Sequence, residues 1–126
     1  LVCGMMKNKG VVGFVTDGLA RDRAGILASG LPVFCAGISP NSPARTGPGT
    51  TNLPILLGGV SVSPGDVVVG DADGVVIVPQ AMLDAVIARL KEIRTAEAAA
   101  EAKVKAGAVM VPAAERILKS DRVKRI

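Results

Sequence analysis

Charged side chains gather in one short stretch, where a run of apolar residues gives way to a polar segment. Residues 17–22 read Asp-Gly-Leu-Ala-Arg-Asp and follow the strand-forming residues 11–15. A short helix is expected directly after them, so the stretch lies where a strand ends and a helix begins. Open α/β folds bind ligands at this position. A helix N-terminus adds free backbone N–H groups and a partial positive charge.

Two neighbouring side chains of this stretch indicate a chemistry. The guanidinium of Arg21 can hold a small carboxylate through paired hydrogen bonds, and Asp22 can bind a hard divalent cation. Together they predict metal-assisted chemistry on an anionic, oxygen-rich small molecule. The alternative is structural: Asp17 and Gly18 form a turn, and an Asp stabilises the first turn of the helix that follows.

The composition excludes several kinds of site. The 126 residues contain no His, so this chain alone cannot build a Ser-His-Asp triad, a Cys-His pair or a His-ligated zinc site. A metal site must use carboxylate, carbonyl or water oxygens, which favours Mg²⁺, Mn²⁺ or Ca²⁺. Aromatic residues make up only 2% of the chain, which removes the stacking platforms of single-stranded nucleic-acid binders.

The distribution of charge argues against a nucleic-acid partner. The formal net charge is +4, but residues 115–126 contain five Lys or Arg and two Asp or Glu. Most of the basic excess therefore belongs to a tail, which we expect to be a solvated end. No apolar run approaches the length of a membrane span, and no signal peptide is visible. Cys3 and Cys35 are interpreted as reduced core thiols of a cytoplasmic protein, because no local signature of a disulfide accompanies them.

The elements around the charged stretch follow from the spacing of apolar residues. Residues 1–9 are apolar at helical spacing and end at Gly10, which predicts the end of an amphipathic helix. Residues 11–16 are apolar on both faces, which predicts a buried, parallel and internal strand. A short helix is expected over residues 21–29 and a second strand over residues 31–36.

The middle of the chain combines a long loop with strands. Residues 37–54 are rich in Pro and Gly and predict a shaped loop whose only charge is Arg45, either a ligand group or a solvated side chain. Residues 55–62 predict one strand interrupted by a bulge at Gly58-Gly59. Residues 67–78 predict a hairpin, with Asp66, Asp71 and Asp73 forming turns.

Helical periodicity returns after Pro79. An apolar stripe begins at Leu83, and the pattern becomes Ala-rich and charged before it ends at Gly107. Such a helix is too long and too polar to lie wholly on a small domain, so we expect its end to contact a neighbouring subunit. Residues 112–119 predict a last short helix.

Several motifs, taken in order and spacing, resemble one known family. They are Gly-Phe-Val-Thr-Asp-Gly-Leu-Ala-Arg-Asp at 13–22, Gly-Leu-Pro-Val-Phe at 30–34, Gly-Gly-Val at 58–60, and Pro-Gly-Asp-Val-Val-Val-Gly-Asp-Ala-Asp-Gly-Val-Val at 64–76. This pattern is similar to that of the RraA-like family. The family contains class II pyruvate aldolases acting on 4-hydroxy-4-methyl-2-oxoglutarate and 4-carboxy-4-hydroxy-2-oxoadipate, and also the regulator of ribonuclease activity A. Many members carry an older label as demethylmenaquinone methyltransferases, which this sequence gives no reason to adopt.

The resemblance implies an architecture. It covers residues 1–107 and implies an α/β fold, a β/β/α sandwich of the swivelling-domain type that lacks its N-terminal part here. Residues 108–126 would form a C-terminal tail with a short helix. The family implies assembly as a homotrimer or as a hexamer built from two trimers.

The resemblance also implies roles for named residues. Arg21 matches the Arg of the family's Arg-Asp pair and would hold the carboxylate and keto oxygen of the substrate. Asp22 matches the Asp and would bind Mg²⁺ or Mn²⁺ through a water-rich shell. Leu1 and Val2 fall on the two residues whose backbone amides hold the pyruvyl carboxylate. The Gly-acidic pair that precedes them in the family is absent from this sequence.

Two further residues match less directly. Arg45 stands where the aldolases often carry Lys, which keeps a positive charge for anion binding but puts a role in proton transfer in doubt. Glu97 matches a Glu that is donated across a subunit interface and acts on the metal through water; the alternative is a solvated helix residue. The implied reaction cleaves a 4-hydroxy-2-oxo diacid to pyruvate and a second 2-oxo acid, with decarboxylation of oxaloacetate as a side activity.

Two other functions remain open at this point. The family also implies a non-catalytic regulator that binds and inhibits an RNA-degrading enzyme. Such a regulator need not keep Arg21 and Asp22 together, and this sequence keeps both, which favours the enzyme. A third possibility is a structural remnant without activity.

Overall fold

The computed structural model describes residues 1–124 and divides into two units. The first unit extends from Leu1 to Leu83 and contains every strand of the described chain, whereas the second begins at Asp84 and is helical. The mixture of helices and short strands confirms the predicted α/β class. The predicted division after residue 107 stays a prediction.

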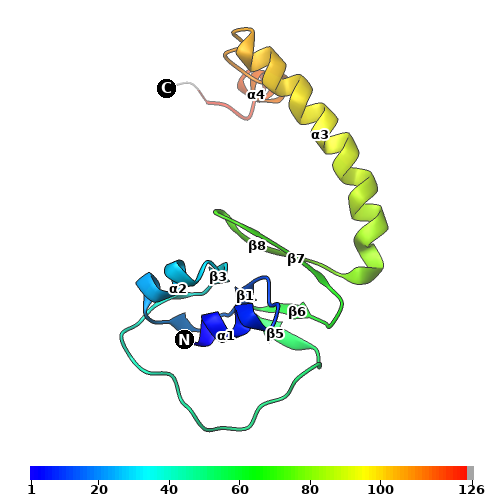
Figure 1. Ribbon diagram of the computed structural model, residues 1–126. Helices are drawn as coiled ribbons and strands as arrows, with labels where there is room; N and C mark the ends of the chain where they lie inside the picture. The colour runs from blue at the N-terminus through cyan, green and yellow to red at the C-terminus, as the bar shows by residue number, and fades with distance from the viewer. Residues whose placement is uncertain (125–126) are drawn as a thin grey trace. The chain divides into compact units, whose positions relative to one another are not determined.

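Two short helices pack against each other in the first unit (Figure 1). They are α1 (Val2–Asn8) and α2 (Arg23–Ser29), and both agree with the sequence pattern. The ammonium of Lys7 donates a hydrogen bond of 2.9 Å to the backbone carbonyl of Ser29. This contact places a positive charge at the carboxyl end of α2, where a helix dipole favours it. Gly30 then leaves the helix with a φ of 66°.

Two parallel strand pairs flank α2 in the chain. β1 (Phe14–Val15) pairs with β3 (Val33–Phe34), and β2 (Leu19–Ala20) pairs with β4 (Gly37–Ile38). Parallel neighbours require a crossover connection, and α2 provides it for both pairs. Leu31, 5% exposed at the end of this crossover, is the one buried residue among those described.

The parallel pairs correct two predictions. The expected strand over residues 11–16 is reduced to two residues, and Val12 is 89% exposed rather than buried. In the described chain only β3 pairs with β1, so the other edge of this strand has no neighbour. Neither β2 nor β4 was predicted, because two-residue strands are too short to show an alternating pattern. Residues 19–20 lie between the expected turn and the expected helix, and residues 37–38 lie in the expected loop.

The segment after the long loop corrects a third prediction. Residues 55–62 form a hairpin of β5 (Ile55–Leu57) and β6 (Val60–Val62), not one bulged strand. Gly58 and Gly59 have φ values of 57° and 84°. Two consecutive left-handed residues produce the tight turn that matches the twist of a hairpin.

The predicted second hairpin is confirmed. It consists of β7 (Val67–Asp71) and β8 (Gly74–Val78), paired in antiparallel register over their whole length. Asp66 holds both of its ends, because its carboxylate accepts hydrogen bonds from the backbone N–H of Ser63 at 2.8 Å and of Gln80 at 3.1 Å. The predicted role of Asp66 as a turn former is therefore confirmed.

The two hairpins are connected to the parallel strands by specific contacts. The Asp17 carboxylate accepts a hydrogen bond of 3.1 Å from the backbone N–H of Gly58, 41 residues along the chain. The ring of Phe34 lies against the backbone of Gly70, where an added Cβ would come within 2.6 Å of the ring. These contacts link β1 to the first hairpin and β3 to the second.

The sequence predicted both helices that are described in the second unit. They are α3 (Leu83–Lys105), whose first residue is the last of the first unit, and α4 (Pro112–Leu118). A 3-10 turn, η1 (Gln80–Met82), lies at the end of the first unit and was not predicted. Glu101 and Lys105, four residues apart on α3, form an ion pair of 2.8 Å. Among the helices of residues 1–124, none is both long enough and apolar enough to cross a membrane.

The contact between Phe34 and Gly70 leads to a prediction about stability. We expect Gly70→Ala to lower the free energy of unfolding by about 1–3 kcal/mol, because the new methyl group overpacks the ring. Denaturant unfolding of the intact protein measures this change. Gly47→Ala is the matched control, since its Cβ would meet no atom within 4 Å. Equal losses in the two variants would contradict the packing argument.

Candidate functional site

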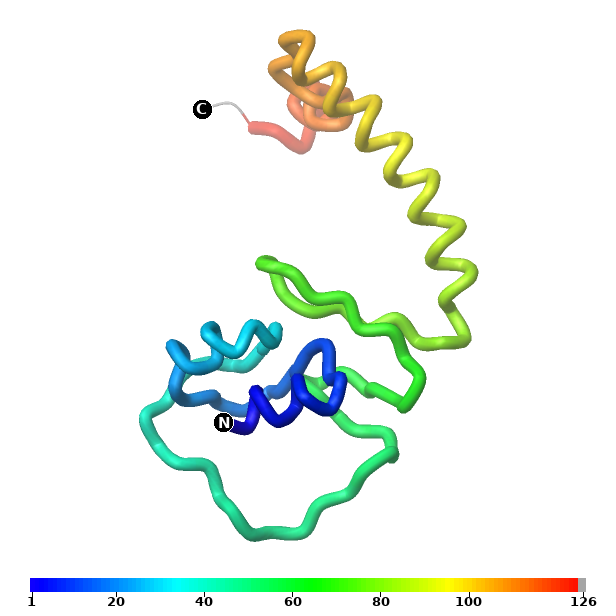
Figure 2. Tube along the Cα trace, in the orientation of Figure 1, coloured from blue at the N-terminus to red at the C-terminus, as the bar shows by residue number. Residues whose placement is uncertain are grey.

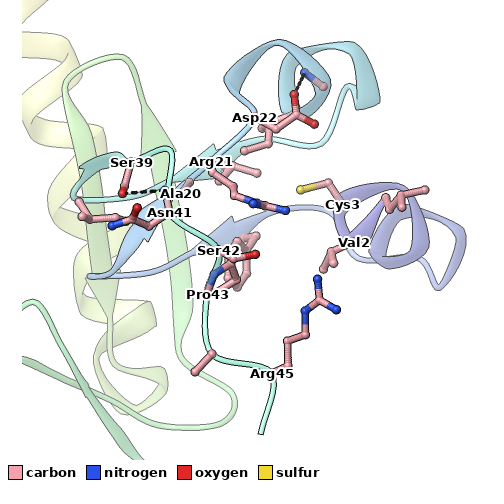
Figure 3. A pocket seen from close by; sticks show the side chains of 17 residues that line it. Val2, Cys3, Ala20, Arg21, Asp22, Ser39, Asn41, Ser42, Pro43 and Arg45 are labelled. Carbon is pink, nitrogen blue, oxygen red and sulfur yellow. Dashed lines mark hydrogen bonds between the residues drawn. The ribbon is translucent and has the colours of Figure 1, made fainter.

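A cavity of about 910 Å³ lies in the first unit, beside the start of α1, the start of α2 and the beginning of the long loop (Figure 3). Five of the six residues singled out from the sequence contribute to its lining. They are Leu1, Val2, Arg21, Asp22 and Arg45. The sixth, Glu97, lies on α3 in the second unit, and its role stays a prediction.

The end of β2 positions Arg21. The backbone N–H of Ser39 donates a hydrogen bond of 2.8 Å to the carbonyl of Ala20, which extends the β2–β4 pairing to the residue before Arg21. From this point the Arg21 side chain extends into the cavity, between Cys3 and Ser42 (Figure 3). Arg21 therefore follows the carboxyl end of a parallel strand, where open α/β folds bind ligands, but this strand is β2 and not the strand expected over residues 11–16.

The long loop supplies the second guanidinium. After β4 the chain makes one wide excursion over residues 39–54 before β5 begins (Figure 2). Arg45 lies on this excursion, and its side chain points toward Val2 across the cavity (Figure 3). Neither Arg21 nor Arg45 forms an ion pair with any residue of the described chain. Two positive charges without a partner thus line one cavity, which suits an anion.

Asp22 occupies an unusual backbone conformation at the start of α2. Its φ and ψ are 64° and 55°, in the left-handed region, and only Asn52 shares a positive φ among the non-glycine residues described. This conformation is roughly 1 kcal/mol less favourable for a residue with a side chain, and such strain is concentrated at functional sites. Asp22 is also the only acidic residue in the cavity lining.

The carboxylate of Asp22 caps the helix that follows. Its Oδ1 accepts a hydrogen bond of 3.1 Å from the backbone N–H of Gly25, which satisfies one of the free N–H groups of α2. In the described chain the other oxygen, Oδ2, has no protein hydrogen-bond donor. The structural interpretation of Asp22 as a helix-stabilising residue is therefore confirmed, and one oxygen remains available for a ligand.

The first turn of α1 supplies backbone donors beside the same cavity. Leu1 is the N-cap residue and makes no side-chain cap, and the first helical hydrogen bond runs from the N–H of Met5 to the Leu1 carbonyl at 3.0 Å. The N–H groups before Met5 have no partner within the helix. Leu1 and Val2 line the cavity at this turn, which is compatible with their predicted role in holding a carboxylate.

The donor set limits which metal ion could bind. The described residues contain no group of three His, Cys, Asp or Glu side chains able to hold a metal. A cation in this cavity would have the Asp22 carboxylate as its one acidic protein ligand, with water and substrate oxygens completing its shell. Mg²⁺ is typically bound in this way, through one or two carboxylates and several waters. The residues present therefore fit Mg²⁺, or Mn²⁺ with the same oxygen donors.

Cys3 and Gly25 are among the lining residues that were not identified from the sequence as parts of the site. Cys3 was expected in the core, but it is half-exposed and lies in the cavity wall. Its position one residue after Leu1 and Val2, in the same helical turn, was the available signal. Gly25 also lines the cavity, and its spacing of three residues from Asp22 is the ordinary spacing of an N-cap contact. Both Cys3 and Cys35 are free, as predicted, although neither is fully buried.

Comparison with known proteins identifies the family. The RraA-like family model, described as Aldolase/RraA, matches residues 1–77. The chain belongs to the RraA-like family. The match contains β2, α2 and every lining residue of the cavity, so the site described above lies within the part shared with the family.

Three individual proteins are similar to this chain over most of its length. A protein of Halalkalibacterium halodurans named "putative 4-hydroxy-4-methyl-2-oxoglutarate aldolase" is 41% identical over 79% of this chain and 48% of its own length. An uncharacterized protein of Methanocaldococcus jannaschii is 40% identical over 72% of this chain and 44% of its own length. Protein DlpA of Legionella pneumophila is 30% identical over 83% of this chain and 17% of its own length. The chain thus spans about half the length of the first two relatives, and less of the third.

The two free guanidinium groups predict a measurable anion affinity. We expect Arg21→Gln to weaken the binding of oxalate to the intact protein by roughly tenfold or more, because a charge-assisted hydrogen bond contributes about 1.5–3 kcal/mol. Isothermal titration calorimetry measures the dissociation constant. Arg23→Gln is the matched control, since this neighbouring Arg does not line the cavity. An equal loss in both variants would mean that oxalate responds only to the overall charge.

Proposed function

We propose that this protein acts as a class II pyruvate aldolase that depends on Mg²⁺ or Mn²⁺ and cleaves a 4-hydroxy-2-oxo diacid to pyruvate and a second 2-oxo acid. The observation that carries the proposal is the convergence of Arg21, Asp22 and Arg45 on one cavity beside the open first turn of α1. The printed name of the Halalkalibacterium halodurans relative supports the same reaction class.

Binding of the pyruvyl half of the substrate follows from the cationic and N–H donors. The Arg21 guanidinium would hold the carboxylate and the keto oxygen, and the N–H groups at the start of α1 would donate to the carboxylate. As the C3–C4 bond breaks, negative charge develops on the pyruvyl oxygens, and these fixed donors would stabilise it. Mg²⁺ or Mn²⁺, when bound near Asp22, supplies Lewis-acid polarisation of the 2-oxo group.

The far half of the substrate would meet Arg45. A guanidinium does not lose its proton in the ordinary pH range, so Arg45 can bind a second carboxylate but cannot serve as a proton carrier. Proton transfer would instead use water held by the free oxygen of Asp22, within hydrogen-bond reach of the cavity. A diacid would therefore fit this cavity, with one carboxylate bound by Arg21 and the other by Arg45.

The same arrangement accounts for the further parts of the proposal. Oxaloacetate would be decarboxylated as a side reaction, because its cleavage also leaves negative charge on the pyruvyl oxygens. Glu97 of a neighbouring subunit, in a homotrimer or a hexamer, would act on the metal through water. The two free thiols are suited to the cytoplasm, where we expect the protein to act. A non-catalytic regulator of an RNA-degrading enzyme would not require two cationic groups and a carboxylate in one cavity.

Product formation tests the reaction directly. We expect the intact protein to release pyruvate from a 4-hydroxy-2-oxo diacid in the presence of Mg²⁺ and to stop on addition of EDTA. A lactate dehydrogenase-coupled assay measures the pyruvate, and oxaloacetate serves as the second substrate. Failure to form metal-dependent pyruvate from either compound would overturn the aldolase proposal and leave the regulator as the better candidate.

A single substitution separates the metal role of Asp22 from its structural role. We expect Asp22→Asn to lower the rate at least a hundredfold, because the amide loses the negative charge that a divalent cation requires. The fold should be retained, because Asn is as good an N-cap as Asp and tolerates the left-handed region. The assay is pyruvate release, with circular dichroism as the check on folding. A folded variant with the full rate would show that Asp22 does not bind the metal.

A further inference from the structure

Position 25 in the cavity wall is a glycine, and the Asp22 carboxylate beside it leaves no room for a side chain there. Gly25 is the third residue of α2, and its backbone does not need the left-handed region. An added Cβ would overlap Oδ2 of Asp22 and would lie 2.8 Å from its Cγ and 2.9 Å from its Oδ1. The carboxylate of Asp22 therefore occupies the space that any side chain at position 25 would fill.

The backbone of α2 gives no other reason for this glycine. Glycine is less favourable than alanine inside a helix, since it loses more conformational freedom on folding. A Cβ added at the equivalent position in α1, Gly4, would meet nothing within 4 Å. The close approach at Gly25 is thus specific to Asp22 and is not a general property of the short helices.

Arg21 and Asp22 point in different directions, and the space over Gly25 makes this possible. Figure 3 shows the Asp22 carboxylate turned back onto the first turn of α2, whereas the Arg21 side chain extends into the cavity. No ion pair joins Arg21 and Asp22, although they are adjacent in sequence. The position over Gly25 therefore separates the carboxylate from the guanidinium and leaves the guanidinium free for an anion.

We propose that Gly25 is a positioning residue that gives the Asp22 carboxylate a resting place on α2, where Oδ1 caps the helix and Oδ2 stays open to the divalent cation. This inference rests on the proposed function, because that function makes Asp22 a metal ligand. In the resting place, Oδ1 accepts the 3.1 Å hydrogen bond from the Gly25 N–H, and Oδ2 accepts none from the described residues. The hydrogen bond holds the carboxylate in the cavity wall, so loss of the resting place weakens metal binding by about fivefold, the usual effect of one N-cap.

The first test measures metal affinity without substrate or turnover. Free Mn²⁺ is titrated into the intact protein and followed by electron paramagnetic resonance. We expect Gly25→Ala to raise the dissociation constant by about fivefold, since the methyl group displaces the carboxylate from the position in which Oδ2 is open to the cation. Gly4→Ala is the matched control and should leave the constant unchanged. An unchanged or lower dissociation constant for Gly25→Ala would overturn the proposal.

The second test needs no metal. We expect Asp22→Ala to lower the denaturation midpoint of the wild-type protein but not that of Gly25→Ala, because the second background has already lost the cap. Gly25→Ser carries the same Cβ and should repeat the result. Equal effects of Asp22→Ala in both backgrounds would show that Gly25 does not position the carboxylate.

The two tests distinguish failure of this inference from failure of the proposed function. A wild-type protein that binds no Mn²⁺ would reject the metal function, together with the part of this proposal that concerns metal affinity. The double-substitution experiment would still decide whether Gly25 positions Asp22. Conversely, Mn²⁺ binding that is abolished by Asp22→Asn and unaffected by Gly25→Ala would retain the metal function and reject the resting place.

Discussion

The pairing of β2 with β4 is the constraint on which the rest of the site depends. Its last hydrogen bond, from Ser39 to Ala20 at 2.8 Å, fixes the chain immediately before Arg21 and immediately before the long loop. One short ladder thereby sets the starting points of both segments that carry a guanidinium. Because α2 is the crossover between the parallel strands, its first turn must also begin at this edge, which places Asp22 there. The cavity is therefore a consequence of topology, and its chemistry depends on three side chains.

The left-handed conformation of Asp22 follows from the same topology. The chain must turn from the end of β2 into α2 within Arg21 and Asp22, and a sharp change of direction over so few residues requires a positive φ. Glycine would adopt this conformation without strain, but it would supply neither a cap nor a charge. Asp is among the few side chains that tolerate the region, and its hydrogen bond to the Gly25 N–H offsets part of the strain. Asp22 is therefore both the strained residue and the candidate metal ligand, because the turn that requires its left-handed conformation also faces the cavity.

The sequence predicted the elements whose signals extend over many residues. The helix from Leu83 to Lys105 and the hairpin of β7 and β8 show a clear period or a clear turn, so local chemistry was sufficient to identify them. The hairpin at Gly58 was misinterpreted as a bulge, because two glycines suit either structure until the pairing partner is known. The pairing of β2 with β4 depends on contacts across the crossover and left no local pattern. Residue type was enough to identify the Arg-Asp pair, and Arg45 was assigned to the same site through the family resemblance. The close contact between Asp22 and Gly25 was not predicted, because it depends on the left-handed conformation of Asp22.

The charges of the cavity favour a dianionic ligand over a monoanion. Arg21 and Arg45 contribute two positive charges and Asp22 one negative charge, so the protein alone leaves a positive excess that a single carboxylate would neutralise. A divalent cation beside Asp22 increases this positive excess by two charges. A substrate with two carboxylates then neutralises two of them, and one positive charge remains. Negative charge that develops on the substrate oxygens during bond cleavage would be stabilised by that remaining positive charge. Under the proposed function, a diacid provides a carboxylate for each guanidinium, whereas a monoacid would leave one guanidinium without a partner.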